Sequence, residues 1–436
     1  MEHLASIDAA AWPRVAKVPR GIRVSVKAQR AEKAFAKACE DAGVELDITA
    51  ASGPDILVEH DALFARIADS GWLGMAEAYM AGEWLTPSSD KLVEVLTKLL
   101  RHGYSPVSAK VPAEPHEGGE VPPELVALFS GDGISPGPGI FATGVPTTVR
   151  ESVSSFAPGA GRGREPKEHF VDITYVSEPS VTEREDLPDA QGRNADWMLD
   201  SAHVGAGTHV LVYPGSGARA AVNAVGRRGI IDVLGADTAQ LEALREYFVL
   251  AGVDDGIHVQ DIPEAIPHAK DWRGRYEAIV SVDFLTTLGP RQRRDYFAAL
   301  DRLLMPGGRA VLSGLVAATG GATGKQLADA SLSALRAYVW PGLHLDEATD
   351  VHKVCDRSSG LRIIAQAHLG AHAQASLRLQ REIFEGRLRE AAAAGFDPVF
   401  RRLWVFQFAI REALLAAGLV DYVHFTATHR NRGGRR

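Results

Sequence analysis

Three features of the sequence predict an α/β protein built around a doubly wound, mostly parallel sheet. Residues 205–316 alternate short apolar runs with longer amphipathic segments in regular order. The amphipathic segments have helix length, about 10–15 residues, as in parallel βαβ units with right-handed crossovers. The stretch His209–Val225 runs from an apolar segment through a glycine turn into a small-residue helix, which is the opening of a Rossmann-like βα unit.

Composition limits the class of protein further. A chain of 436 residues is too long for one ordinary core, and 46% hydrophobic with 23% charged residues is typical of a globular protein. The net charge of −8 argues against general nucleic-acid binding. No apolar run approaches the roughly 20 residues that span a bilayer. With no recognisable export signal, Cys39 and Cys355 are expected to be reduced thiols in a cytoplasmic protein.

The first domain, residues 1–105, is predicted to be mostly helical. Apolar residues recur at helical spacing around a glycine break in residues 62–84, and residues 90–100 form an amphipathic pattern with Asp90 as the expected N-cap. A short apolar run, Ile56–His60, predicts a strand before these helices.

Residues 106–193 are predicted to be a linker and pocket cover. Dense proline and glycine through residues 103–168 argue against long helices and strands there. An irregular stretch of this length is typical of a functional cover or a linker. A helix over Asn194–Ala202 is expected to lead into the next domain.

The third domain, residues 194–318, carries the predicted sheet, and residues 319–436 form a helical cap that completes the core. Two long amphipathic helices are expected in the cap, over 375–395 and 397–418. The strands predicted in the third domain are 208–214, 230–236, 257–261, 276–283 and 309–316, with helices over 218–229, 238–252 and 291–308.

Several motifs together resemble those of one enzyme family. They are WPRVAKVPRG (Trp12–Gly21), AYMAGEW (Ala78–Trp84), YEAIVSVDFLTTLG (276–289), YFAALDRLLMPGG (296–308) and YVWPG (Tyr338–Gly342), in the family's order and spacing. The chain resembles the cyclopropane fatty-acyl-phospholipid synthases over nearly its whole length. It is most similar to the actinobacterial branch that methylates oleoyl phospholipids on the way to 10-methyl stearate.

The resemblance implies a Rossmann-like class I methyltransferase fold with an N-terminal lipid-binding domain and a C-terminal helical cap. It also implies S-adenosylmethionine as methyl donor to a cis double bond of a phospholipid acyl chain, with bound bicarbonate removing a proton. A protein of this type is expected at the cytoplasmic face of the membrane.

At the predicted cofactor turn, this chain departs from the family pattern. An ungapped match places Val212 where the family has an acidic residue, and a shift by one residue recovers two glycines in the turn. Losing one charge-assisted hydrogen bond to the cofactor costs roughly 1.5–3 kcal/mol, so a reduced affinity for S-adenosylmethionine is expected. The cofactor-binding residues that the resemblance implies at the turn are Tyr213, Gly215, Ser216 and Gly217.

Two acidic residues are further candidates for cofactor binding. Asp261 stands where the family contacts adenine, and Asp237 lies just beyond the second strand, within reach of a ribose hydroxyl. Aspartate is also favoured at helix caps and turns, so a purely structural role stays open for both residues.

The reaction centre departs further from the family pattern. The family's lid motif falls on Gly118–Glu120, and its bicarbonate-contacting cysteine falls on Pro138. A late tyrosine falls on Ala373, beside His372, which would substitute in part or be a satisfied core histidine. The candidate catalytic residues are Asp283, in place of a bicarbonate-holding glutamate, and Ser313, in place of a histidine.

Two main hypotheses follow, with changed chemistry on the same scaffold as a third. One is a non-catalytic, lipid-surface-binding subunit that forms a homodimer or pairs with an active synthase or a reductase of the pathway. The other is an active methyltransferase acting on oleoyl phospholipids. The simultaneous changes in one pocket slightly favour the first. Basic clusters at Gly161–Lys167 and His429–Arg436 can attract an anionic membrane surface, although a solvated loop and a frayed tail are the favoured interpretation. The sequence shows neither zinc-ligand spacing nor a phosphate loop.

Overall fold

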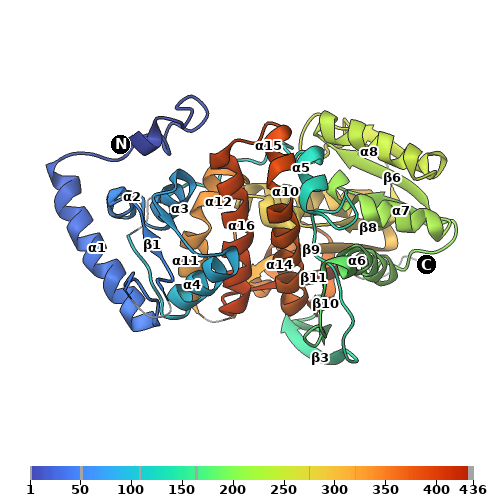
Figure 1. Ribbon diagram of the computed structural model, residues 1–436. Coiled ribbons are helices and arrows are strands. Elements are labelled where there is room, and N and C mark those ends of the chain that lie inside the picture. The colour runs from blue at the N-terminus through green and yellow to red at the C-terminus, as the bar shows by residue number, and fades with distance from the viewer. Residues whose placement is uncertain are drawn as a thin grey trace. The chain divides into compact units, whose positions relative to one another are not determined.

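The computed structural model describes residues 2–49, 53–107, 110–162, 165–273, 275–319 and 321–430 (Figure 1). The chain divides into two compact units. Unit 1 comprises residues 1–112, 318–341 and 380–420, and unit 2 comprises residues 113–317, 342–379 and 421–436.

Unit 1 is helical, as predicted for the N-terminal region. The predicted short strand is present as β1 (Leu57–Val58), which pairs antiparallel with β2 (Trp84–Leu85). The helices that lie wholly in unit 1 are α1 (Ile22–Ala42), α2 (Ala62–Ser70), α3 (Trp72–Ala81), α4 (Ser89–Arg101), α11 (Ala322–Ser331), α12 (Ser333–Tyr338), α15 (Leu388–Ala393) and α16 (Pro398–Ala416).

The predicted N-cap of α4 was wrong by two residues. Ser88 has the extended backbone of a cap, and its side chain accepts a hydrogen bond from the backbone N–H of Lys91 at 3.1 Å. Asp90 lies in the first turn instead and accepts a hydrogen bond from Arg381 Nη2 at 2.7 Å. A serine satisfies the free N–H groups of a helix end as well as aspartate does, so residue type alone did not decide between the two positions.

A buried ion pair organises the N-terminal segment of unit 1. Arg66 is 1% exposed, and its Nε donates to Glu83 Oε2 at 2.8 Å. The same guanidinium donates to the backbone carbonyls of Arg14 at 2.9 Å and Val15 at 2.6 Å. A buried charge is stable only when it is paired and hydrogen-bonded. The guanidinium N–H groups of Arg66 need acceptors, and by donating to these two carbonyls they hold the segment around residue 15 to α2.

Unit 2 contains a nine-stranded sheet in the order β3-β4-β10-β11-β9-β8-β5-β6-β7. The five strands predicted from the sequence form one half of it, and their pairs β9-β8, β8-β5, β5-β6 and β6-β7 are parallel. These strands are β5 (His209–Val212), β6 (Ile230–Gly235), β7 (Ile257–Asp261), β8 (Tyr276–Ser281) and β9 (Leu304–Ala317).

Helices cover both faces of this sheet, which confirms the doubly wound fold. On β5, Val210 and Val212 belong to the core beneath one set of helices, whereas Leu211 belongs to the core beneath the other. Helices of the first face are α6 (Leu187–Ser201), α7 (Ala218–Gly226) and α8 (Thr238–Leu250), and those of the second are α10 (Pro290–Leu303) and α13 (Ala348–Ser358). Strands buried on both faces are apolar almost continuously, which is why these were recognisable.

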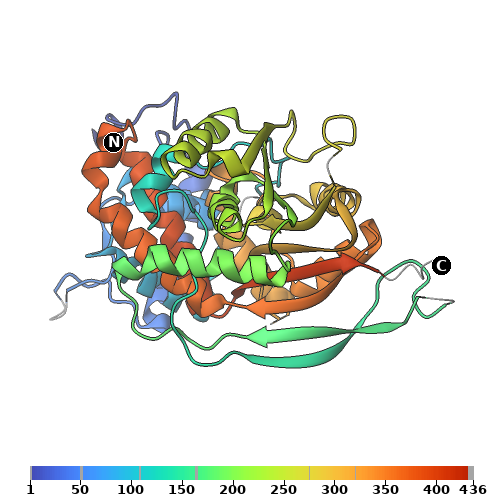
Figure 2. The ribbon, with the colours of Figure 1, turned by 90° about the vertical axis from the view of Figure 1, so that its right-hand side faces the viewer.

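Four further strands were not predicted. β3 (Thr147–Ser154) and β4 (Glu168–Tyr175) form an antiparallel hairpin along one edge of the sheet (Figure 2), although the surrounding glycines and prolines argued against strands. Prolines and glycines stop before Thr147 and resume after Ser154, which leaves room for an eight-residue strand. The other two are β10 (Leu361–His368) and β11 (Val420–His429), within the region expected to be only helical.

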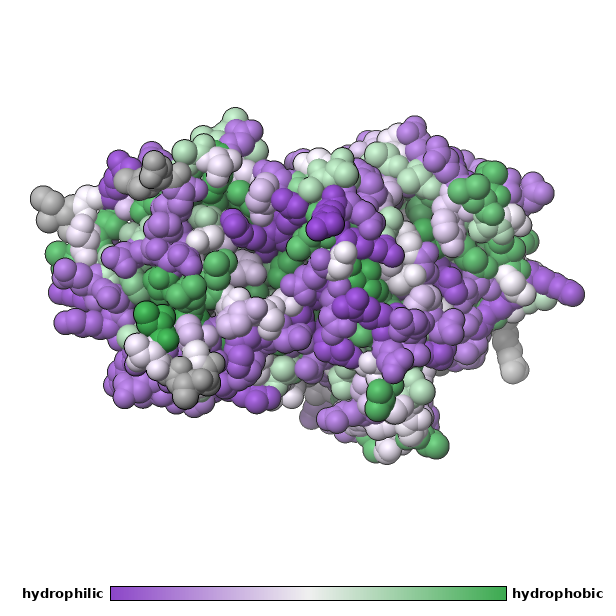
Figure 3. Space-filling model, in the orientation of Figure 1, coloured by the Kyte–Doolittle hydropathy of each residue, from purple (hydrophilic) through white to green (hydrophobic). Residues whose placement is uncertain are grey.

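The hairpin exposes some hydrophobic residues. Phe170 is 66% exposed and Tyr175 is 48% exposed. Figure 3 shows the lobe that contains β3 as a mixture of hydrophobic and hydrophilic surface. Scattered apolar residues of this kind are normal on a protein surface.

Both basic clusters noted in the sequence lie in part outside the described residues, because positions 163–164 and 431–436 are not described. Within the described ranges, no helix combines the length and the apolar character needed to cross a bilayer.

His424 and His352 of unit 2 are buried without an acidic partner. His424 on β11 is 2% exposed, and neither ring nitrogen has a hydrogen-bond partner. Burial lowers the pKa of His424 to about 3 and that of His352, on α13, to about 4. Both rings therefore stay neutral in the folded protein near pH 6.5, where the histidines of the unfolded chain begin to take up protons.

We predict that the free energy of unfolding falls on acidification below about pH 6.5. The unfolded histidines take up protons near pH 6.5 while the folded ones do not, so each removes about 1.4 kcal/mol between pH 7.5 and 5.5. Urea denaturation at several pH values measures this loss. His424→Leu is expected to reduce the loss, and the exposed-site variant His268→Gln to leave it unchanged; an equal pH dependence in all three proteins would contradict the prediction.

Candidate functional site

The predicted site residues meet at the carboxyl ends of the parallel strands, where doubly wound sheets bind ligands. The turn after β5, the residues after β6 and the end of β8 lie there, all within unit 2. The structure brings together the glycine turn, Asp237, Asp283 and Ser313, and it places Asp261 at the surface.

The glycine turn folds as a tight corner. Gly215–Gly217 form a single 3-10 turn, and α7 begins at Ala218. Tyr213 enters this corner through a cis peptide bond to Pro214, and its side chain is 1% exposed. The Tyr213 hydroxyl donates to the carbonyl of Ala265, and its ring lies 5.2 Å from that of Phe284. Its side chain is therefore part of the core, and only its backbone faces the turn.

A residue that the sequence did not single out also faces the turn. The side-chain oxygen of Gln240 is buried and has no hydrogen-bond partner. It would lie 3.1 Å from a Cβ atom placed on Gly215, so the missing side chain of that glycine leaves room for it. An unpaired buried amide oxygen is costly, so this oxygen is a feature of the corner that suits a polar ligand. The only signal for it in the sequence is its place in the first turn of a predicted helix.

Both carboxylate oxygens of Asp237 accept hydrogen bonds from backbone N–H groups of the chain. Its Oδ1 accepts from the backbone N–H of Gln240 at 3.0 Å, as an N-cap of α8, and its Oδ2 accepts from the backbone N–H of Glu120 at 3.1 Å. Gly118 has a φ of +83°, and a Cβ there would lie 2.5 Å from the Cβ of Ala236. The segment aligned with the family's lid motif thus packs directly onto the end of β6 and covers Asp237.

Asp261 ends β7 at the surface. Its side chain is 48% exposed, and Oδ1 accepts from Arg245 Nη2 at 2.9 Å. The structure thus places this carboxylate in a surface ion pair with α8.

Asp283 and Ser313 form a compact cluster with Tyr422, which the sequence did not single out. The Tyr422 hydroxyl donates to Asp283 Oδ1 at 2.6 Å and lies 2.8 Å from Ser313 Oγ. Ser313 Oγ also accepts from the backbone N–H of Asp283 at 3.1 Å. Ser313 and Tyr422 are 0% and 4% exposed. Tyr422 lies 139 residues from Asp283 on a strand that was not predicted, so only the fold reveals the contact.

The segment around Pro138 closes the remaining side. Gln191, on α6, donates to the carbonyls of Ser135 at 2.8 Å and Gly137 at 3.2 Å. Gly137 lies against Val282 and Asp283. The cavity left between this segment, the glycine turn and Val282 has a volume of about 20 Å³. Sites for small ligands usually span about 300–1,000 Å³, so this cavity is far too small for a nucleotide.

His372 is a satisfied core histidine. It is 0% exposed, its Nδ1 accepts from the backbone N–H of Phe141 at 3.0 Å, and its Nε2 lies 3.0 Å from the carbonyl oxygen of Ser177. Both ring nitrogens are engaged in holding two loop segments, and burial lowers the pKa of the ring.

Comparison with known proteins decides the family. The sequence profile of the mycolic acid cyclopropane synthetase family matches residues 172–425, which is more than half of the chain. The chain belongs to this family. It therefore carries the fold and ancestry of the S-adenosylmethionine-dependent methyltransferases of the cyclopropane and methyl fatty-acid synthase type.

The chain is also similar to individual proteins. The chain is 28% identical to the tuberculostearic acid methyltransferase UfaA1 of Mycobacterium tuberculosis (strain ATCC 25618 / H37Rv), over 97% of this chain and 96% of the relative. Among solved structures, the [4+2]-cyclase SpnF matches with a TM-score of 0.50 and 14% identity, covering 73% of this chain and 98% of that chain. The cyclopropane synthase MmaA2 from Mycobacterium tuberculosis matches with a TM-score of 0.47 and 19% identity, covering 55% and 85%.

The described residues of this family member do not fit S-adenosylmethionine in the conformation observed. Val212 has no charge to offer and packs in the core with Val282. Both oxygens of Asp237 are bonded within the protein, and Gln240 alone offers a free buried acceptor. Binding would require residues 118–120 to leave the end of β6.

We predict that Tyr422→Phe destabilises the protein by roughly 1–3 kcal/mol, because Asp283 and Ser313 both lose a buried hydrogen-bond partner. The midpoint and slope of urea denaturation measure this change. Tyr175→Phe, at a half-exposed tyrosine, is the matched control and should leave the midpoint unchanged. Equal midpoints for the wild type and Tyr422→Phe would show that the cluster contributes nothing to stability.

Proposed function

We propose that this chain is a non-catalytic member of its family that binds a phospholipid surface and acts beside a catalytic partner. The observation that carries the proposal is the hydrogen-bonded cluster of Asp283, Ser313 and Tyr422. Groups that bond to one another in a buried corner are not available to hold a substrate or a small anion.

The cofactor side of the corner supports the same conclusion. The glycine turn has Val212 in place of the family's acidic residue. The nearby Asp237 carboxylate already accepts a hydrogen bond from the backbone N–H of Glu120, and the cavity beside the turn has a volume of only about 20 Å³. Catalytic residues that act as a unit depend on one another, so replacing several of them at once is expected to abolish activity.

Bicarbonate has no place in the proposed function. Its negative charge would lie beside the carboxylate of Asp283, and like charges in a buried site repel strongly. The hydroxyls of Tyr422 and Ser313, the neutral donors nearest to Asp283, are engaged with that residue and with each other.

Two features support the lipid-binding part of the proposal. The helical unit 1 keeps the AYMAGEW element, with Trp84 fully buried and Glu83 paired with Arg66. The relative that matches over almost the whole chain is by name a tuberculostearic acid methyltransferase, and tuberculostearic acid is a fatty acid. We place the protein at the cytoplasmic face of the membrane, as a homodimer or in a complex with an active synthase or a reductase of the same pathway.

The unpaired oxygen of Gln240 favours a second candidate function, an active methyltransferase on oleoyl phospholipids. If residues 118–120 opened, this oxygen and the glycine turn would face a cofactor. The two functions differ in whether the isolated chain binds S-adenosylmethionine and transfers its methyl group.

We predict that S-adenosylhomocysteine at millimolar concentration does not raise the melting temperature of the purified chain. A ligand at about 100 times its dissociation constant stabilises a protein by about 2.7 kcal/mol, so micromolar binding would be plain in the measurement. Gln240→Leu should behave as the wild type does. A stabilisation that is lost in Gln240→Leu would establish the second candidate function instead.

The matching activity test uses vesicles of dioleoyl phospholipid and S-adenosylmethionine labelled in its methyl group. We expect the chain to sediment with the vesicles and to leave their acyl chains unlabelled, with UfaA1 as the positive control. Labelled acyl chains would refute the non-catalytic assignment, and failure to sediment would refute the lipid-surface assignment.

A further inference from the structure

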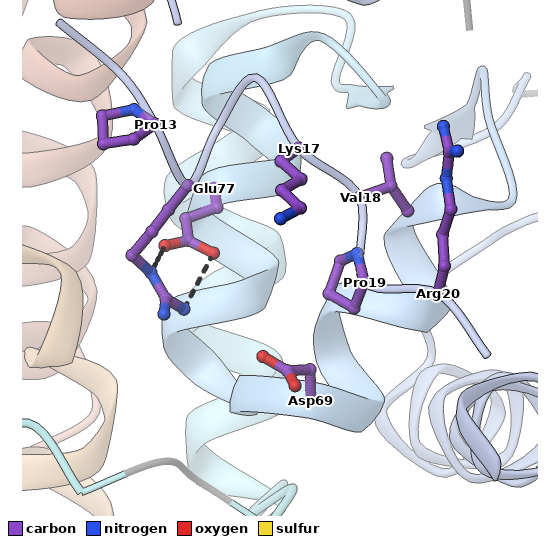
Figure 4. Close-up of a pocket in the computed structure, with 8 residues that line it drawn as sticks. Pro13, Lys17, Val18, Pro19, Arg20, Asp69 and Glu77 are labelled. Carbon is purple, nitrogen blue, oxygen red and sulfur yellow. Dashed lines mark hydrogen bonds and ion pairs between the residues drawn. The ribbon is translucent and has the colours of Figure 1, made fainter. Parts of the chain in front are cut away.

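Unit 1 contains a pocket of about 470 Å³ between its N-terminal segment and helices α2 and α3 (Figure 4). That volume suits a small polar ligand. The pocket lies apart from the residues that the cofactor corner uses. It is lined by Pro13, Arg14, Lys17, Val18, Pro19, Arg20, Asp69 and Glu77.

The walls of this pocket are fixed by buried interactions. Arg66 holds the carbonyls of Arg14 and Val15, and its own charge is balanced by Glu83. Trp12 Nε1 donates to Asp397 Oδ2 at 2.6 Å, which anchors the start of the same segment to α16. The pocket is therefore preformed, and a ligand would not have to order its lining.

One acidic residue of the pocket is already neutralised. Glu77 is 3% exposed and accepts from Arg14 Nε at 2.6 Å and from the Tyr338 hydroxyl at 2.7 Å. The pair of Glu77 and Arg14 contributes no net charge, although the Arg14 side chain is still 50% exposed and can donate further.

Three charged residues line the pocket besides Arg14 and Glu77. Arg20 has an interaction of its own, and the other two, Lys17 and Asp69, carry opposite charges. The Lys17 ammonium has no hydrogen bond or ion pair with any residue in the described part of the chain. The Asp69 carboxylate accepts only from the Ser70 hydroxyl, at 2.9 Å, and is exposed. Figure 4 shows Lys17 and Asp69 on different sides of the pocket, and the two residues form no ion pair with each other. Such a pair is complementary to a zwitterion.

We propose that this pocket binds a phosphoethanolamine group, with its phosphate at Lys17 and the exposed edge of Arg14 and its primary ammonium at Asp69. A quaternary ammonium such as choline has no N–H to donate and is recognised by aromatic faces, whereas none of the eight lining residues is aromatic. A primary ammonium, in contrast, donates directly to a carboxylate. The group belongs either to a phospholipid head or to a free phosphoester; the first case rests on the lipid-surface part of the proposed function.

The test measures binding of the full chain to three probes. They are soluble glycerophosphoethanolamine, by calorimetry, and two vesicle preparations with equal phosphatidylglycerol content, one rich in dioleoyl phosphatidylethanolamine and one in dioleoyl phosphatidylcholine. We expect tighter binding to the ethanolamine vesicles. Asp69→Asn, which keeps the acceptor for Ser70, and Lys17→Gln should each weaken ethanolamine binding about tenfold, the effect of one lost charge-assisted contact.

Matched controls exist on α1, where Asp41 and Lys27 are exposed. Asp41→Asn and Lys27→Gln change the net charge as the test variants do and should leave all binding unchanged. Circular dichroism confirms that every variant is folded.

Each outcome separates this inference from the proposed function. Vesicle binding without head-group preference, or unchanged by Asp69→Asn, would overturn the pocket assignment and leave lipid-surface binding intact. Calorimetric binding of glycerophosphoethanolamine that depends on Asp69, without vesicle binding, would support the pocket and overturn the lipid-surface assignment. Absence of binding to all three probes would overturn both.

Discussion

The contact between Tyr422 and Asp283 is the constraint on which the functional corner of unit 2 depends. Asp283 has a φ of +59°, a left-handed backbone that a non-glycine residue adopts only at a cost. Its side chain is held by Tyr422, and its backbone N–H is held by Ser313. The corner is thus stabilised by the protein's own polar groups, at the place where an enzyme of this fold would leave such groups free for its ligands.

In this corner, the residues that pack in the core differ from the residues that would take part in a reaction. Val212 occupies an acidic position of the family and is fully buried among the aliphatic residues of β5, β8 and their helices. An acidic side chain there would need a bound partner to offset its burial, whereas valine needs none. Under the proposed function, a change of this kind would remove chemistry without disturbing the core, so the scaffold could stay intact while the reaction is lost.

The sequence was informative where one local pattern decides the structure. Four of the five parallel strands were predicted because they are largely buried and mostly apolar, whereas the edge strand β7 (Ile257–Asp261) is partly exposed and was predicted from its place in the alternation of strands and helices. β10 and β11 escaped notice because polar residues such as Gln366 and His424 interrupt their apolar pattern, even though these side chains are buried. The cluster around Asp283 depends on pairing between distant strands, so its third member could not be found from spacing. Gln240 was missed for a different reason: its role follows from the absence of a side chain at Gly215.

The two polar networks described above each lie within one unit. Arg66, Glu83, Arg14 and Glu77 all belong to unit 1, and Asp283, Ser313 and Tyr422 all belong to unit 2. They share no residue, and polar groups couple strongly only when they belong to one network. The loss of activity that we propose therefore places no chemical demand on the pocket beside Lys17 and Asp69. A chain without a catalytic centre could keep this charged pocket, because the Arg66–Glu83 ion pair that shapes it lies within unit 1 and shares no residue with the reaction corner.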